Sequence, residues 1–134
     1  MSNDTQSPGP NSPKNAPLEV YPGWVRSGQD DTPGQKAYYI NLEAKPGKEK
    51  EVADFLRSAL PLVNGEPGTI SWYAIQEGPS SFAIFDTFND EAGRDAHLNG
   101  KVAAALMEKI TAGNMFDKTP EIHKLGIIAD KSAK

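Results

Sequence analysis

Few residues of this sequence suit proton transfer near neutral pH, because it contains two histidines and no cysteine. His97 is a candidate general base, since imidazole titrates near neutral pH. Asn41 is a candidate hydrogen-bond donor to an oxyanion, because few other polar groups share its face of a predicted strand. Each also has a structural interpretation: His97 caps or hydrogen-bonds within its helix, and Asn41 satisfies a backbone group.

Asp86 is a third polar candidate, and it lies in an otherwise apolar strand predicted at residues 82–88. Side chains alternate along a strand, so Asp86 shares one face with Phe82, Ile84 and Phe88. The other face is also largely apolar, and we therefore expect the strand to be covered on both sides. A carboxylate in that position needs a partner or water, so it is either a structural acceptor or part of a site.

A flat substrate would need aromatic side chains to stack on, and the predicted strands supply several. Trp72 and Tyr73 are adjacent, so only one of them faces a cavity while the other lies under the helices. Aromatic residues in strands usually belong to the core, which gives each candidate a structural alternative. The predicted substrate-binding residues are Tyr39, Trp72, Tyr73, Phe85, Asp86 and His123.

The composition argues against several other kinds of site. The net charge is -4 and no basic run occurs, so we expect no nucleic-acid partner. The two histidines are far apart and lack clustered carboxylates, which predicts no metal; glycine-rich phosphate motifs are missing, and we expect no cofactor. No apolar stretch is long enough to span a membrane and no signal-peptide pattern occurs, so we expect a cytoplasmic protein without a membrane partner.

The 134 residues divide into an arm, one domain and a short tail. Residues 1–17 are rich in Ser, Asn, Pro and Gly and are predicted to be disordered. Apolar residues around Trp24 predict that the arm docks on its own domain or on a partner subunit. We therefore expect a disordered or docking arm at residues 1–36, a folded domain at residues 37–130 and a tail at residues 131–134.

The folded domain shows the order strand, helix, strand, strand, helix, strand. Strands are predicted at residues 37–44, 69–77, 82–88 and 121–129. Pro61 lies within the apolar pattern of the first helix and predicts a kink or an early end near Leu60. The second helix has Asn89 as its predicted N-cap, is interrupted at residues 99–100 and ends at residues 113–114.

This order of elements predicts a ferredoxin-like α+β fold, βαββαβ, with an antiparallel four-stranded sheet and both helices on one face. The opposite face would carry several of the candidate aromatic residues, which are too apolar to lie against water as one patch. A second subunit that packs its own sheet there would cover them. We therefore expect a homodimer with a cavity between or beside the two sheets.

Three segments carry a resemblance to a known family: residues 44–48 (AKPGK), 66–69 (EPGT) and 85–98 (FDTFNDEAGRDAHL). Over about residues 37–130 the sequence resembles the antibiotic biosynthesis monooxygenase (ABM) domain family. Members share a dimeric α+β barrel of ferredoxin-like subunits, so the resemblance implies this assembly here. They include cofactor-free monooxygenases that oxidise phenols, quinols and anthrones, haem-degrading enzymes, and many proteins with no known substrate.

Individual positions refine what the resemblance implies. His97 matches a histidine of the quinol-monooxygenase-like members, whereas Lys101 and Val102 lie near the place of their second histidine. The family usually has Glu in place of Asp86, and Tyr or Trp in place of Phe88.

The haem-degrading branch is a poorer match. Asn41 matches an asparagine that this branch uses, but Phe85 stands where it has a tryptophan. Leu106 or Met107 falls where it has a histidine. Haem degradation is therefore disfavoured.

Two hypotheses of function follow. The first is a cofactor-independent monooxygenase, an oxidoreductase, acting on a small aromatic substrate (a quinol, an anthrone or a polyketide-like molecule) in a barrel cavity. In it His97 is the base and Asn41 the oxyanion donor. The second is a non-catalytic small-molecule-binding or structural dimer of the same fold, which Phe85, Phe88 and the missing second histidine favour. An RNA-recognition module shares the strand order, but the net acidity and the lack of a basic residue on the Asp86 strand argue against it.

Overall fold

The computed structural model describes residues 19–21, 24–27 and 33–131. Within these residues the strands are β1 (Glu19–Tyr21), β2 (Trp24–Ser27), β3 (Lys36–Glu43), β4 (Thr69–Gln76), β5 (Ser81–Phe88) and β6 (Glu121–Gly126). The helices are α1 (Glu49–Asn64), α2 (Glu91–Leu98) and α3 (Lys101–Ala112). The predicted disordered segment at residues 1–17 and the tail residues 132–134 lie outside the described residues.

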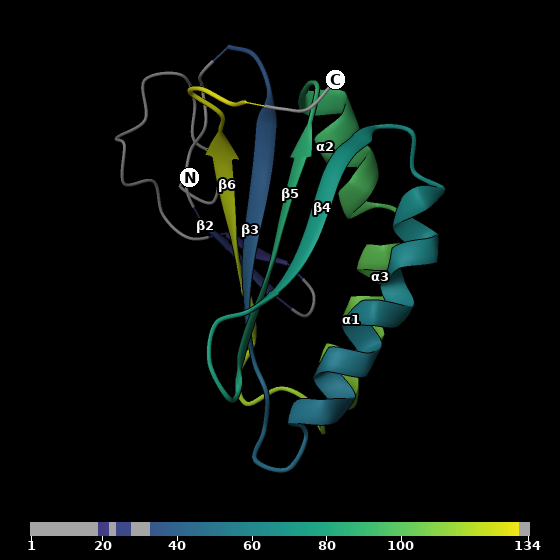
Figure 1. Ribbon diagram of the computed structural model, residues 1–134, viewed down its shortest axis with the longest axis vertical. Coiled ribbons are helices and arrows are strands. Elements are labelled where there is room, and N and C mark those ends of the chain that lie inside the picture. Colours follow the sequence, from purple (N-terminus) through teal and green to yellow (C-terminus); the bar gives the residue numbers. More distant parts are fainter. Residues whose placement is uncertain (1–18, 22–23, 28–32, 132–134) are drawn as a thin grey trace, which may run out of the picture.

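The described strands form one sheet in the order β1-β2-β6-β3-β5-β4. Its central strands, β6-β3-β5-β4, pair antiparallel with one another. All of the described helices lie on one side of this sheet (Figure 1). This arrangement confirms the predicted ferredoxin-like α+β fold. The structure describes a single chain, so the two-subunit barrel stays a prediction.

A short hairpin extends the sheet beyond the strands of the ferredoxin-like fold. β1 pairs antiparallel with β2, and β2 pairs parallel with β6. The hairpin therefore lies along the outer side of β6, and β4 forms the opposite edge of the sheet. Part of the arm thus continues the sheet of the folded domain.

Several element boundaries differ from the predictions. The N-cap of α2 is Asp90 instead of Asn89, because the Asp90 carboxylate accepts a hydrogen bond from the backbone N–H of Gly93 at 2.9 Å. Helix α1 runs through Pro61 to Asn64, so of the two predicted alternatives, a kink or an early end near Leu60, the early end is wrong. The last strand ends at Gly126, three residues before the predicted boundary at residue 129.

The second predicted helix was expected to be interrupted at residues 99–100, and the structure confirms this break as the junction between α2 and α3. Helix α2 ends at Leu98, Gly100 is the N-cap of α3, and α3 ends at Ala112. The cap that follows it, Gly113, has φ 77°, a left-handed conformation that glycine adopts without steric cost.

The core lies between the sheet and the helices. On β5 the side chains of Phe82, Ile84, Asp86 and Phe88 are all buried on the helix side. Phe85, on the opposite side of the same strand, is only partly buried. Ala83, also on that opposite side, is fully buried. Among the described residues, therefore, the strand is fully covered on one face and partly covered on the other.

Candidate functional site

A buried cluster of charged side chains lies beneath the helices, centred on His97. One ring nitrogen, Nδ1, is 2.5 Å from Glu66 Oε1, and the other, Nε2, is 2.9 Å from Asp86 Oδ2. His97 is 5% exposed and Asp86 is fully buried. Thr69 also donates its hydroxyl to Glu66 Oε1 at 3.1 Å. The histidine therefore joins α2 to both β5 and the loop before β4.

The protonation of this cluster follows from its burial and its charges. Burial lowers the pKa of His97, but the hydrogen bonds and negative charges of Asp86 and Glu66 outweigh it and raise that pKa above its usual value. Burial also raises the pKa of Asp86, and its contact with His97 offsets only part of the effect. A ring with both nitrogens held by carboxylates has no free lone pair, which argues against a role as a base. Its partners lie on β5 and in the loop before β4, not within its own helix as the structural interpretation expected.

The Asp86 carboxylate has two partners, the His97 ring at 2.9 Å and the backbone of Tyr38. Glu66 Oε2 and the Trp72 indole N–H, by contrast, are buried without a hydrogen-bond partner in the described part of the chain. Trp72 lies opposite Asp86 in the β4–β5 register, so this unpaired N–H belongs to a position next to the charged cluster.

Close backbone contacts explain why two of the family-like segments meet here. A Cβ atom on Gly93 of α2 would lie 2.9 Å from the carbonyl oxygen of Gly68, too close for any other residue. A Cβ atom on Gly100 would lie 2.7 Å from Glu66 Oε2. The glycines of the EPGT segment, of α2 and of the α2–α3 junction thus allow the loop and both helices to close around His97.

Arg94 is a second buried charge in the same helix. Its guanidinium donates to the carbonyl of Leu125 on β6 at 2.9 Å and to Glu91 at 2.8 Å, and it lies over the Tyr38 ring. These contacts tie α2 to the end of the sheet. Arg94 and His97 therefore fix the same helix at two points.

The open face of the sheet holds a different set of the predicted residues. Tyr39 pairs with His123 on β6 and with Phe85 on β5, and Phe85 pairs in turn with Tyr73 on β4. These aromatic side chains form a row across the sheet, on the face without helices. Tyr73 is 58% exposed and stands at the outer end of this row.

Asn41 lies beside this row and contacts a carboxylate that the sequence analysis did not single out. Glu77 accepts a hydrogen bond from the Tyr39 hydroxyl at 2.7 Å and one from Asn41 Nδ2 at 3.2 Å. The hydrogen bond to Glu77 raises the pKa of the Tyr39 hydroxyl. His97 and Asn41 therefore occupy opposite faces of the sheet, and this chain does not bring them together into one site.

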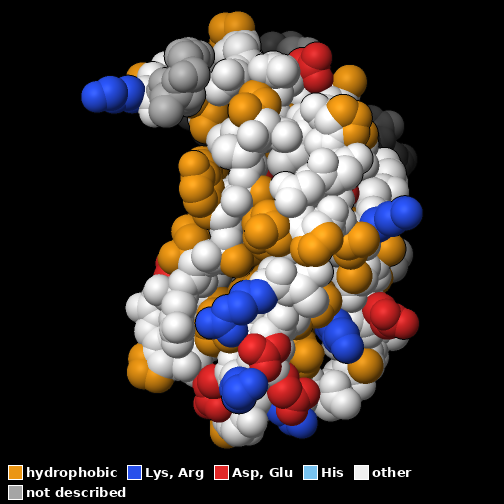
Figure 2. Space-filling view, turned by 45° about the vertical axis from the view of Figure 1, so that its right-hand side comes forward, with side chains coloured by type: hydrophobic (Ala, Val, Ile, Leu, Met, Phe, Trp, Pro, Cys, Tyr) orange, Lys and Arg blue, Asp and Glu red, His pale blue; other side chains and the backbone are white. Residues whose placement is uncertain are grey.

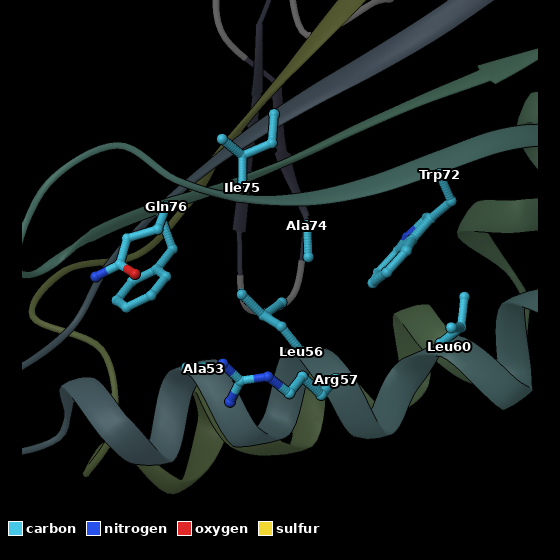
Figure 3. A pocket seen from close by; sticks show the side chains of 9 residues that line it. Ala53, Leu56, Arg57, Leu60, Trp72, Ala74, Ile75 and Gln76 are labelled. Carbon is cyan, nitrogen blue, oxygen red and sulfur yellow. The ribbon is translucent and has the colours of Figure 1, made fainter.

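A pocket of about 300 Å³ lies elsewhere, between α1 and the edge strand β4. Helix α1 contributes Ala53, Leu56, Arg57 and Leu60. Strand β4 contributes Trp72, Ala74, Ile75 and Gln76, and β5 adds Phe82 (Figure 3). On this side of the molecule hydrophobic side chains gather in the middle, with charged ones towards the lower end (Figure 2).

Of the predicted site residues, only Trp72 lines this pocket. It goes under the helices while its neighbour Tyr73 faces the open side, as expected for adjacent strand residues. Sequence reasoning missed all of the other lining residues as site residues. Ala53 and Ala74 are small residues on two elements that the fold places together, a signal that becomes visible only once α1 is known to lie over β4.

The described residues contain no group of three or more side chains placed to hold a metal ion. In the His97 cluster the carboxylates approach opposite ring nitrogens, so their oxygens and the ring do not converge on one point. Among the described helices none is long and apolar enough to cross a membrane.

Comparison with known proteins places the chain in context. The family model described as antibiotic biosynthesis monooxygenase matches residues 38–109. A solved structure of a protein of unknown function from Nitrosomonas europaea is 50% identical, with a TM-score of 0.71, over 75% of this chain and 96% of that one. A structure from Mycobacterium tuberculosis is 11% identical, with a TM-score of 0.64, over 73% and 99%. No protein with a curated description matches the chain.

The fold and these contacts define a class of protein, a ferredoxin-like α+β domain with a charged cluster under its helices and a small pocket beside them. The family match spans more than half of the chain, and the Nitrosomonas europaea protein is aligned over almost its whole length. The chain therefore belongs to the antibiotic biosynthesis monooxygenase family. The Mycobacterium tuberculosis structure, at lower identity, shows the same fold.

Proposed function

We propose that this protein is a homodimeric, cofactor-independent monooxygenase whose small, flat, electron-rich aromatic substrate binds in the α1–β4 pocket. The observation that carries the proposal is the lining of that pocket. It is largely apolar, includes the indole of Trp72, and contains one cation, Arg57. An aromatic wall favours a flat ring, and a guanidinium favours the anionic form of a phenol or anthrone.

The chemistry asks little of the protein beyond binding and charge stabilisation. The deprotonated substrate carbon forms a bond to one atom of O₂. The O–O bond then breaks, one oxygen stays on the substrate as a carbonyl or quinone oxygen, and the other leaves as water. The substrate supplies all the electrons, so no external reductant is needed. Arg57 stabilises the anion that reacts, and solvent takes the proton, because the described lining includes no carboxylate or imidazole.

The test is oxygen uptake with a panel of anthrones, hydroquinones and polyphenols, without any added cofactor. We expect uptake by the wild type and incorporation of one atom from ¹⁸O₂. Ala74→Phe should abolish uptake, because Ala74 is exposed at the pocket and a ring there fills it. Ala104→Phe, at an exposed position on α3, is the matched control and should retain it. Equal uptake in the two variants would overturn the assignment of the pocket.

A second candidate function is a non-catalytic binding protein of the same fold. The specific observation in its favour is that both ring nitrogens of His97 are held by carboxylates. Binding of the same aromatic molecules with no oxygen uptake, measured on a folded dimer, would support this candidate and exclude the oxygenase.

The homodimer is proposed from the open face of the sheet. Tyr73 is 58% exposed there, beside the half-buried Phe85, and a second sheet would cover both side chains. Introducing a charge with Phe85→Glu should dissociate the dimer in sedimentation experiments, whereas Ala104→Glu on the helix side should not. An unchanged dimer in Phe85→Glu would exclude this interface.

A further inference from the structure

A second hollow of about 180 Å³ lies next to the α1–β4 pocket, at the end of α1. Its polar lining consists of Asn64, Glu66, Thr69 and Ser71. Among the described residues, Leu60 and Trp72 are the two that line both this hollow and the α1–β4 pocket. One comes from the helix and the other from the strand, and this pair, which lines both spaces, is called the wall below. Figure 3 shows both side chains at the α1–β4 pocket.

This wall is built from side chains and not from backbone. Leu60 is 47% exposed, and Trp72 is only partly buried. Because Leu60 is half exposed, a change of its rotamer needs no movement of α1, whereas Trp72 packs against both clusters of core residues.

The wall residue Trp72 is also incompletely satisfied in its present position. Its indole N–H is buried and has no acceptor among the described residues. A buried donor without a partner is unfavourable, and a ligand oxygen beside the ring would supply the missing acceptor. The indole is thus a group that a ligand can pair with as it passes.

The two spaces differ in chemistry. The α1–β4 pocket is lined mainly by apolar side chains, and the second hollow carries a carboxylate, an amide and two hydroxyl-bearing side chains. One continuous site of this kind suits a molecule with an apolar flat part and a polar arm.

We propose that the two hollows are subsites of one ligand site, parted by Trp72 and Leu60, for an aromatic ring that carries a hydroxyl-bearing arm. The ring occupies the α1–β4 pocket, and the arm passes the indole and reaches Asn64 and Glu66. The identity of the ring rests on the proposed function, but the two-subsite arrangement does not depend on oxygenation.

The experiment compares hydroquinone with 2-(2,5-dihydroxyphenyl)ethanol, which has the same ring and a hydroxyethyl arm. Binding is measured by calorimetry under argon, so turnover does not interfere. We expect the probe with the arm to bind about tenfold more tightly, as for one good hydrogen bond to a charged acceptor. Asn64→Leu and Asn64→Ala, which make the second hollow less polar, should each reduce that preference and leave hydroquinone binding unchanged.

A second readout follows the wall directly. The sequence contains two tryptophans, so Trp24→Phe leaves Trp72 as the one indole. In that variant, labelled with 5-fluorotryptophan, the ¹⁹F resonance should shift with the arm-bearing probe and move less with hydroquinone. Equal affinities for the two probes, an unchanged preference in both hollow variants, or no response of Trp72 would overturn the two-subsite arrangement. Loss of oxygen uptake with the arm preference intact would instead overturn only the oxygenase.

Discussion

The charged cluster around His97 and the α1–β4 pocket lie on the same side of the sheet, yet they are built from different parts of the sequence. The cluster uses Asp86, Glu66 and His97, all within the family-like segments, and it is almost closed to solvent. The pocket takes only Trp72 from the predicted candidates and is otherwise lined by residues outside those segments. The difference teaches that the recognisable motifs of this chain hold α2 and the loop before β4 against the sheet, while the α1–β4 pocket is lined by residues outside those motifs.

The largest expected effect comes from removing His97, the centre of the buried charged cluster. In His97→Ala the Asp86 and Glu66 carboxylates lose their shared partner inside the protein. Breaking a buried ion pair in this way costs roughly 3–5 kcal/mol of unfolding free energy. Urea denaturation of the variant against the wild type measures the loss.

His123→Ala is the control for this substitution, because that histidine is 38% exposed on the open face. It should change the unfolding free energy by no more than about 0.5 kcal/mol. A similar small change in His97→Ala would mean that the cluster contributes little to stability and that His97 is available for another role.

Raising the pH should have a smaller effect on the unfolding free energy than His97→Ala, because it removes a proton from the His97 ring and leaves the ring in place. The pKa of His97 is raised in the folded protein, so the protonated ring stabilises the fold below the unfolded value near 6.5. That contribution is lost as the pH rises through the folded pKa. The pKa of Asp86 is also raised in the folded protein, from an ordinary value of 3.8, so its contribution to stability is likewise lost as the pH rises.

The measurement is the unfolding free energy from pH 5.5 to pH 9 in wild type and in His97→Gln. We expect the wild type to lose stability with rising pH over this window, and the variant to lose less. Glu66, Asp86 and the Phe88 ring contact His97, so the charged groups in direct contact with it are both acidic. Parallel curves for the two proteins would contradict the assignment of the proton to His97.

Substitutions at the α1–β4 pocket should change ligand affinity and leave the charged cluster around His97 unaffected. Arg57 is 77% exposed and pairs with Asp54 at 3.1 Å, so its replacement removes the pocket cation at little cost to the fold. Arg57→Gln should weaken binding of an anionic phenol two- to fivefold, in proportion to a partly screened charge pair. Lys50→Gln, which removes another partner of Asp54 outside the pocket, should leave binding unchanged. Equal losses in both variants would indicate a general charge effect instead.

How far the sequence predicts these regions depends on which physical signal each region uses. Period-two patterns gave the strands and the separation of Trp72 from Tyr73, and residues 99–100 gave the break between α2 and α3. The N-cap was missed by one residue, because Asn89 and Asp90 are both good caps and only the chain path distinguishes them. Asp86 was expected to need a partner or water, and the structure supplies His97 from a different element.

The pairing of His97 with Asn41 shows the limit of sequence reasoning. Both residues have types that suit catalysis, but alternation in β3 places Asn41 on the open face while α2 covers the other one. The pocket was not predictable, because small residues such as Ala53 and Ala74 carry no chemical signal until packing places α1 beside β4.

The smallest expected effect concerns Tyr39 on the open face. The stability cost of replacing it tests whether this face is exposed to solvent or covered by a second subunit. In one chain the Tyr39 hydroxyl donates to Glu77 at an exposed position, so Tyr39→Phe should cost at most about 0.5 kcal/mol of unfolding free energy. If a second sheet covers this face, the same hydrogen bond is buried and its loss costs more. Thermal unfolding at two protein concentrations, about a hundredfold apart, distinguishes the cases. A cost that grows with concentration supports the homodimer, and a small cost at both concentrations would show that the face stays open to solvent.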